Sequence, residues 1–138
     1  MVDIGLLIVG HLIGDYIVQN DWMALNKKKP GLAGTIPCLI HCFWYSMAVS
    51  LIGAMNSNAT VRCYLFLIAF VTHYPIDRTN VVERWMELFG QTTFKTVELI
   101  EDEKLRAARK QFVPLVYVGV DNSVHLLLMV LAVKLIIG

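Results

Sequence analysis

Apolar residues fill four long stretches of the chain, and short polar segments separate them. The stretches cover residues 4–19, 36–55, 60–77 and 113–137. A helix needs about 20 mostly apolar residues to cross a bilayer, and each stretch meets or approaches that requirement. The first is short and is interrupted by His11 and Asp15, and Pro114 is expected to open the last one. The pattern therefore predicts an all-α protein, a four-span transmembrane helical bundle formed by one integral membrane domain, residues 1–138.

The longest polar segment, residues 78–112, connects the third and fourth stretches. Its first part carries apolar residues at helical spacing, namely Val81, Val82, Trp85, Leu88 and Phe89. Gly90 is expected to end this helix, and a second, more charged helix is expected over residues 94–111. Such a segment is typical of an amphipathic cytoplasmic connector that lies on the membrane surface. A lid over a functional site is the alternative interpretation.

Basic residues gather in two of the connecting segments. The first loop contains Lys27, Lys28 and Lys29, and the connector of residues 78–112 contains seven further lysines and arginines. Cytoplasmic loops of membrane proteins carry an excess of such residues. We therefore expect both segments on the cytoplasmic side of a bacterial inner membrane, with the amino and carboxyl termini outside the cytoplasm.

The composition also indicates a membrane protein. Hydrophobic residues make up 57% of the chain and charged residues 17%, with a mean hydropathy of +0.59. Soluble domains average roughly 45–50% apolar and about 25% charged residues. The formal net charge is +1 and no basic stripe is interleaved with aromatic residues, so no nucleic-acid partner is expected. Membrane lipid is the expected partner, and oligomerisation is left open.

Every histidine lies within or at the end of an apolar stretch, and three of the four have an aspartate four residues away. Residues at this spacing share one face of a helix. The order is His then Asp in the first and third stretches, but Asp then His in the fourth, which crosses in the opposite direction. The aspartates should therefore lie about one helical turn from the histidines, on the same side in every span. The seven residues expected to converge as metal ligands are His11, Asp15, His41, His73, Asp77, Asp121 and His125.

These residue types suit a divalent transition metal, because imidazole favours zinc, manganese or iron over magnesium. Helical bundles that hold two metals use inward-facing carboxylates and histidines, so seven ligands are also consistent with two ions. Asp15, Asp77 and Asp121 are the candidate catalytic carboxylates. A lone histidine in an apolar helix is more often a core residue, and a proton relay or a structural polar network is the alternative for the whole set. Cys38 and Cys42 are expected to be buried thiols, with Cys38 as an alternative soft ligand.

Three further polar residues flank the predicted site. Gln19 extends the polar face of the first stretch, and Arg78 directly follows Asp77. Arg78, Gln19 and Lys27 are therefore candidates for binding an anionic substrate or a lipid headgroup. For Arg78 the alternative is a purely topological role as a basic residue at the cytoplasmic end of a span.

The chain resembles a family of short bacterial and phage integral membrane proteins of unknown function. The residues that carry the resemblance are the segment from His11 to Trp22, His41, the segment from His73 to Arg78, and the segment from Asp121 to His125. More loosely, the chain is similar to predicted membrane-bound metal-dependent hydrolases that place His-x-x-x-Asp pairs in transmembrane helices. This second resemblance implies hydrolysis of a lipid or a lipid-linked phosphoester.

Taken together, the sequence favours a membrane-embedded metal-dependent hydrolase. One alternative is a proton or metal-ion transporter that uses the same histidines and aspartates. The other is a non-catalytic phage or bacterial accessory protein whose polar residues only specify helix packing.

Overall fold

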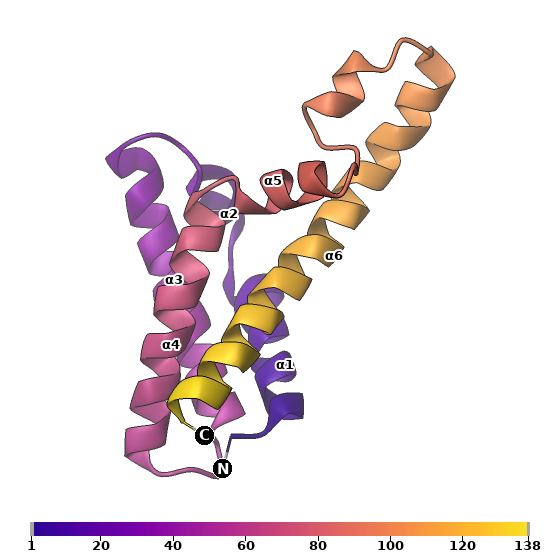
Figure 1. The fold of residues 1–138 in the computed structure, drawn as a ribbon. Coiled ribbons are helices and arrows are strands. Elements are labelled where there is room, and N and C mark those ends of the chain that lie inside the picture. Colours follow the sequence, from indigo (N-terminus) through magenta and orange to yellow (C-terminus); the bar gives the residue numbers. More distant parts are fainter. Residues whose placement is uncertain (1, 138) are drawn as a thin grey trace. The chain divides into compact units, whose positions relative to one another are not determined.

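The computed structural model describes residues 2–137, and their regular elements are all helical (Figure 1). In chain order they are α1 (Ile4–Leu12), the π-helix η1 (Ile13–Val18), α2 (Asp21–Asn26), α3 (Leu32–Gly53), α4 (Ala59–Arg78), α5 (Val81–Leu88), the 3₁₀ helix η2 (Thr96–Leu99) and α6 (Glu103–Ile136). No strand occurs within residues 2–137, which confirms the all-α class.

The chain divides into two compact units. The first extends to Thr79 and resumes at His125, and the second comprises residues 80–124. The first unit thus contains α1 to α4 and the last part of α6, whereas the second contains α5, η2 and the first part of α6. All four histidines belong to the first unit.

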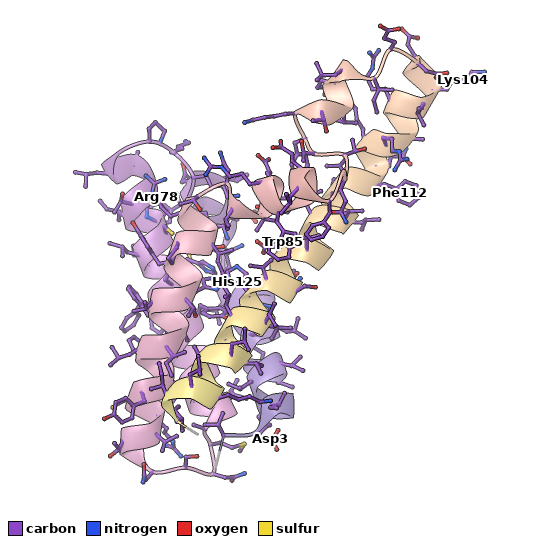
Figure 2. All side chains as sticks on the ribbon, in the orientation of Figure 1. Asp3, Arg78, Trp85, Lys104, Phe112 and His125 are labelled. Carbon is purple, nitrogen blue, oxygen red and sulfur yellow. The ribbon has the colours of Figure 1, made fainter. Side chains whose placement is uncertain are left out.

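Three helices, α3, α4 and α6, are long and apolar enough to cross a membrane. Residues Ile4–Val18 form a shorter apolar helix. Side chains project outward along the length of α3 and α4 (Figure 2), and large apolar ones such as Phe43, Trp44 and Leu67 are exposed. Soluble monomers rarely expose apolar surface on this scale, so these helices indicate a membrane protein.

The apolar core of the first unit is formed by side chains from α1, α3, α4 and the end of α6. Its buried members are Leu7, Tyr45, Val49, Ala54, Leu65, Ala69 and Met129. Asn58 caps α4 by accepting a hydrogen bond from the Val61 N–H at 3.0 Å. Arg62 donates to the carbonyls at the end of α3, at 3.1 Å from Ala54 O and 2.7 Å from Met55 O. These capping contacts hold α3 and α4 side by side as an antiparallel pair (Figure 1).

Two glycines allow α1 and η1 to approach α3 closely. A β-carbon added at Gly10 would lie 2.9 Å from Val49 Cα, and one added at Gly14 would lie 2.6 Å from Tyr45 Cδ2. Both distances are well below the ~3.5–4.0 Å at which carbon atoms pack favourably. Gly10 and Gly14 therefore form the small-residue contact that is common where membrane helices meet backbone to backbone.

The start of α6 differs from the sequence-based expectation. The helix begins at Glu103 and continues through Pro114, so the expectation that Pro114 opens the fourth stretch is wrong. The start lies earlier because the Asp102 carboxylate accepts a hydrogen bond from the Leu105 N–H at 2.9 Å and caps the first turn. Good helix formers then precede the proline, which removes one backbone hydrogen bond without ending the helix. The separate helix expected over residues 94–111 is replaced by η2 and the first turns of α6.

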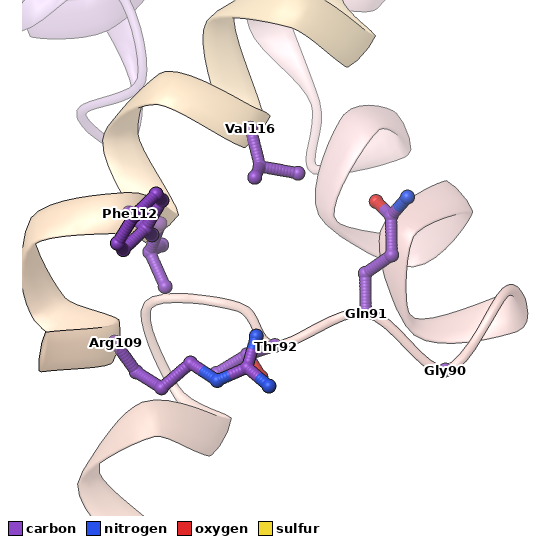
Figure 3. Close-up of a pocket in the computed structure, with 7 residues that line it drawn as sticks. Gly90, Gln91, Thr92, Arg109, Phe112 and Val116 are labelled. Atoms are coloured by element: carbon purple, nitrogen blue, oxygen red, sulfur yellow. The ribbon is translucent and has the colours of Figure 1, made fainter. Parts of the chain in front are cut away.

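The second unit contains an amphipathic helix and a small cavity of its own. Helix α5 buries Val82 and Met86 and leaves Trp85 45% exposed. The cavity has a volume of about 270 Å³, and its lining includes Arg109 and Phe112 (Figure 3). No histidine or aspartate is among its lining residues, so the predicted metal ligands lie outside it.

Candidate metal centre

The first unit buries all four histidines, and each comes from a different helix. The exposed fractions are 0% for His11 on α1, 0% for His41 on α3, 1% for His73 on α4 and 2% for His125 on α6. The ring centroids of His41 and His73 are 5.0 Å apart, and those of His73 and His125 are 4.0 Å apart. The imidazoles therefore face one another inside the first unit instead of facing lipid.

Four ligand-type atoms meet at the centre of this group. The Nε2 atoms of His41 and His73 are 2.9 Å apart. Asp77 Oδ2 lies 3.0 Å from the first nitrogen and 3.2 Å from the second. Asp15 Oδ1 lies 3.4 Å from each of them. We refer to His41, His73, Asp77 and Asp15 as the central cluster.

The spacing of the two imidazole nitrogens with either carboxylate oxygen is that of ligands around one cation. Neighbouring ligands in a tetrahedral or octahedral site, each about 2.0–2.2 Å from the ion, are separated by roughly 2.8–3.6 Å. All five ligand-to-ligand distances given above fall in this range. The donor set, two imidazole nitrogens and two carboxylate oxygens, is one that zinc, manganese and iron accept. The central cluster therefore fits a divalent transition metal.

Hydrogen bonding alone accounts poorly for the same contacts. A neutral imidazole carries a single N–H, yet each Nε2 atom is approached by the other Nε2 and by two carboxylate oxygens. Asp15 Oδ1 is buried and has no hydrogen-bond partner among the described residues. A buried charge is costly unless it is paired or coordinates a metal. A cation bound by the two nitrogens and a carboxylate oxygen would satisfy these buried atoms.

The π-helix η1 carries Asp15 into the cluster. The sequence spacing predicts an ordinary α-helical pair of His11 and Asp15, but the chain changes from α1 to η1 at Ile13, between the two residues. His11 Nδ1 nevertheless remains 3.5 Å from Asp15 Oδ2. Single π-turns inside helices occur frequently at functional sites. Here the π-turn holds an aspartate whose two oxygens face different histidines.

Tyr45 supports the cluster from α3 and was not singled out from the sequence. Its hydroxyl lies 2.9 Å from His11 Nδ1. Its ring stacks on that of His73, with the centroids 3.6 Å apart and the planes at 19°. On its other face His73 stacks with His125, whose Nε2 is 3.5 Å from Asp77 Oδ1. The available signal was the spacing of Tyr45, which follows His41 by one helical turn.

Lys27 and Gln19, both predicted from the sequence as substrate-binding residues, contact each other, and Lys27 also contacts Asp77. The Lys27 ammonium is 2.7 Å from Asp77 Oδ2 and 3.0 Å from Gln19 Oε1. The side chain of Lys27 is 16% exposed and that of Asp15 is 11% exposed, whereas His41 and Asp77 are 0% and 3% exposed. Lys27 and Asp15 are therefore the more exposed residues of this group, and we call them the exposed side of the cluster.

Arg78 and Asp121 are two further residues that the sequence predicts for the site. At the end of α4 (Figure 2), Arg78 donates from Nη2 to the Gly31 carbonyl at 3.4 Å. Asp121 precedes His125 by one turn of α6 but belongs to the second unit. It is therefore not counted among the ligands that the first unit assembles, and its role stays a prediction.

Cys42 is a second residue that the sequence reasoning did not select. Its sulfur, together with ligand atoms of His73 and Asp77, forms a group whose members all lie within 4.8 Å of one another. Cys38, which the sequence suggested as a soft ligand, is 4.0 Å from Cys42 between the two sulfur atoms. Both thiols are fully buried. A thiol beside the cluster favours a borderline or soft ion such as zinc.

Comparison with known proteins identifies a family but no function. No curated protein and no solved structure matches the chain. One family model, described as "Protein of unknown function (DUF3307)", matches residues 4–138 and so covers the whole central cluster. The chain therefore belongs to the family of proteins of unknown function DUF3307.

Proposed function

We propose that this protein is a membrane-embedded metal-dependent hydrolase that acts on a lipid or a lipid-linked phosphoester. The observation that carries the proposal is the convergence of two imidazole nitrogens and two carboxylate oxygens at 2.9–3.4 Å inside an apolar helical unit. Ionisable groups at membrane depth are expensive and usually mark a functional site. The proposed cofactor is a zinc, manganese or iron ion.

The roles proposed for the individual residues follow from the distances between their side chains and from their exposed fractions. His41, His73 and Asp77 are the most deeply buried members of the cluster and would hold the ion, as in catalytic zinc sites that use three protein ligands. When bound, such an ion would supply Lewis-acid chemistry at an ester or phosphoryl oxygen. Asp15 is more exposed and accepts the proton of the attacking water. His11 and Tyr45 hold Asp15 in position, through the 3.5 Å contact to its Oδ2 and the 2.9 Å contact between His11 and Tyr45.

Access from one side supports a hydrolase over a transporter. Lys27 and Asp15 mark the exposed side of the cluster. Beyond Tyr45 lie buried apolar residues such as Met129, whose Sδ is 4.0 Å from the Tyr45 hydroxyl. A substrate with an apolar tail could present its polar group at the exposed side while the tail stays in lipid.

A proton or metal-ion transporter is the second candidate. It is favoured by the continuous series of polar contacts from Lys27 through Asp77, His41 and Asp15 to His11. Such a series can relay protons between buried groups. Uptake of protons or metal into liposomes without any hydrolysis product would select this candidate.

The proposed membrane arrangement has four spans in a bacterial inner membrane. It treats Ile4–Val18 as a short span, with Lys27 to Lys29 and the connector on the cytoplasmic side and both termini outside. The short first helix, about 22 Å at 1.5 Å per residue, would require local thinning of the bilayer. With this orientation, the exposed side of the cluster opens toward the cytoplasm.

The test is metal content combined with turnover. Protein purified in detergent without chelator is analysed for bound transition metals, and hydrolysis is assayed with bis(p-nitrophenyl) phosphate in mixed micelles. Asp77→Asn and His73→Ala should each abolish bound metal and turnover, while the exposed control Asp21→Asn should retain both. Wild-type protein that hydrolyses the ester while free of metal would contradict the proposal. Full function with asparagine at the cluster aspartates would favour a non-catalytic accessory protein.

A further inference from the structure

The Lys27 ammonium is a cation already bound to one of the proposed metal ligands. It lies 2.7 Å from Asp77 Oδ2, the same oxygen that is 3.0 Å from His41 Nε2 and 3.2 Å from His73 Nε2. A divalent ion held by these three atoms would lie within a few ångströms of the ammonium. Two cations at that distance in a site of low dielectric repel each other strongly. Metal binding therefore favours a change of partner for Lys27.

The net charge of the site also favours binding of an anion together with the metal. Without metal, the carboxylates of Asp15 and Asp77 and the ammonium of Lys27 leave one net negative charge, because histidines that act as ligands are neutral. A divalent ion converts this to one net positive charge. An uncompensated charge in a water-poor site is costly. One additional anionic group would restore neutrality.

Lys27 is placed so that it can exchange partners. It is the residue that follows the short helix α2, and its side chain is at the exposed side of the cluster. Gln19 accepts a second hydrogen bond from the ammonium at 3.0 Å, so the group stays near the opening when it leaves Asp77. A lysine ammonium is a flexible point charge that binds phosphate oxygens readily.

We infer that the site binds a phosphate group together with its metal, and that Lys27 transfers from Asp77 to an oxygen of this phosphate when the metal enters. The inference rests on the proposed metal centre and specifies its ligand: a phosphate or phosphomonoester, either on a lipid headgroup or free. Metal and phosphate then bind cooperatively, and Lys27 is the residue that couples them.

The experiment measures the affinity of the full chain in detergent for Co²⁺, with and without inorganic phosphate. Phosphate should tighten Co²⁺ binding to the wild type by a factor typical of coupled sites, roughly 5–150-fold. Lys27→Met keeps the aliphatic stem but removes the charge, so it should bind Co²⁺ more tightly than the wild type without phosphate. The phosphate effect should disappear in this variant.

Two further variants separate the coupling from general effects of substitution. Lys27→Arg retains the charge and should retain the phosphate effect, which also guards against a methionine variant that fails to fold. The nearby, exposed Lys29→Met should behave as the wild type. The same measurement with dihexanoyl phosphatidic acid in place of inorganic phosphate identifies the source of the phosphate. A larger increase in Co²⁺ affinity than with inorganic phosphate assigns a lipid headgroup. An equal increase assigns free phosphate.

The outcomes distinguish this inference from the proposed function. Absence of Co²⁺ binding by the wild type would overturn the metal centre and the inference with it. Binding of Co²⁺ with an affinity that phosphate does not change would overturn the inference alone. A phosphate effect of the same size in Lys27→Met would do so as well, since it would locate the anion elsewhere.

Discussion

The close approach of η1 to α3 makes Gly14 a sensitive test of how helix packing positions the metal centre. In Gly14→Ala the new methyl group would lie 2.6 Å from Tyr45 Cδ2 and 3.1 Å from Tyr45 Cα. Relief of this overlap requires a shift of about 1 Å, given that carbon atoms pack at ~3.5–4.0 Å. Tyr45 is fully packed, because its ring stacks on His73 at 3.6 Å and its hydroxyl lies 2.9 Å from His11. The shift must therefore move either η1 with Asp15 or the ring against His73.

The expected cost follows from overpacking of a buried site. An added methyl group in a well-packed core typically destabilises a protein by about 1–3 kcal/mol, and the higher helix propensity of alanine offsets up to about 1 kcal/mol of this. Displacement of the cluster should also weaken metal binding. If the same 1–3 kcal/mol is lost from the metal complex, the affinity falls by roughly 5–150-fold.

The assay is Co²⁺ affinity together with the free energy of unfolding, both in detergent. The matched control is Gly119→Ala on α6, because a β-carbon at Gly119 would meet no atom within 4 Å. This control should leave metal affinity unchanged. Wild-type affinity and stability in Gly14→Ala would show that the contact between η1 and α3 does not hold Asp15 and Tyr45 in place.

Tyr45→Phe keeps the ring stack but removes the hydroxyl 2.9 Å from His11. We expect the free energy of unfolding, measured by chemical denaturation, to fall by roughly 0.5–1.5 kcal/mol. An unchanged free energy of unfolding would argue against this hydrogen bond. Removal of metal by dialysis against a chelator should lower the thermal midpoint, since a ligand at 100 times its Kd stabilises by about 2.7 kcal/mol; superimposable melting curves would speak against a native metal. In a Cys63→Ser background, an impermeant maleimide should label Lys28→Cys and Asn56→Cys from opposite sides of vesicles, because these positions flank α3. Labelling of both positions from the same side would exclude α3 as a span.

The membrane helices and the residue types of the site were predictable because both depend on local sequence. The apolar stretches predicted α3 and α4 to within a few residues, and the four-residue spacing placed His73 and Asp77 on one face of α4. The start of α6 was not predicted, because the capping contact of Asp102 outweighed the signal from Pro114.

The contacts between helices were not predictable from spacing. Lys27 and Asp77 are separated by 50 positions in the sequence, and Tyr45 and His11 by 34. Positive charge in the first loop indicated an anionic lipid or substrate as the partner of Lys27, whereas its ammonium contacts an aspartate of α4. The π-turn that carries Asp15 also has no signal in the hydrophobic pattern, because that pattern reports only which face of a helix is apolar.

Apolar helices with histidines and aspartates paired along them follow from local sequence, since helical periodicity relates residues only three or four positions apart. Packing of the helices against one another brings His41, His73, Asp77 and Asp15 together, places Lys27 beside Asp77 and carries Asp15 to the site from a π-helix. The physical reason is that distances between helices depend on close packing, here at Gly10 and Gly14 against α3, which periodicity along a single helix does not encode.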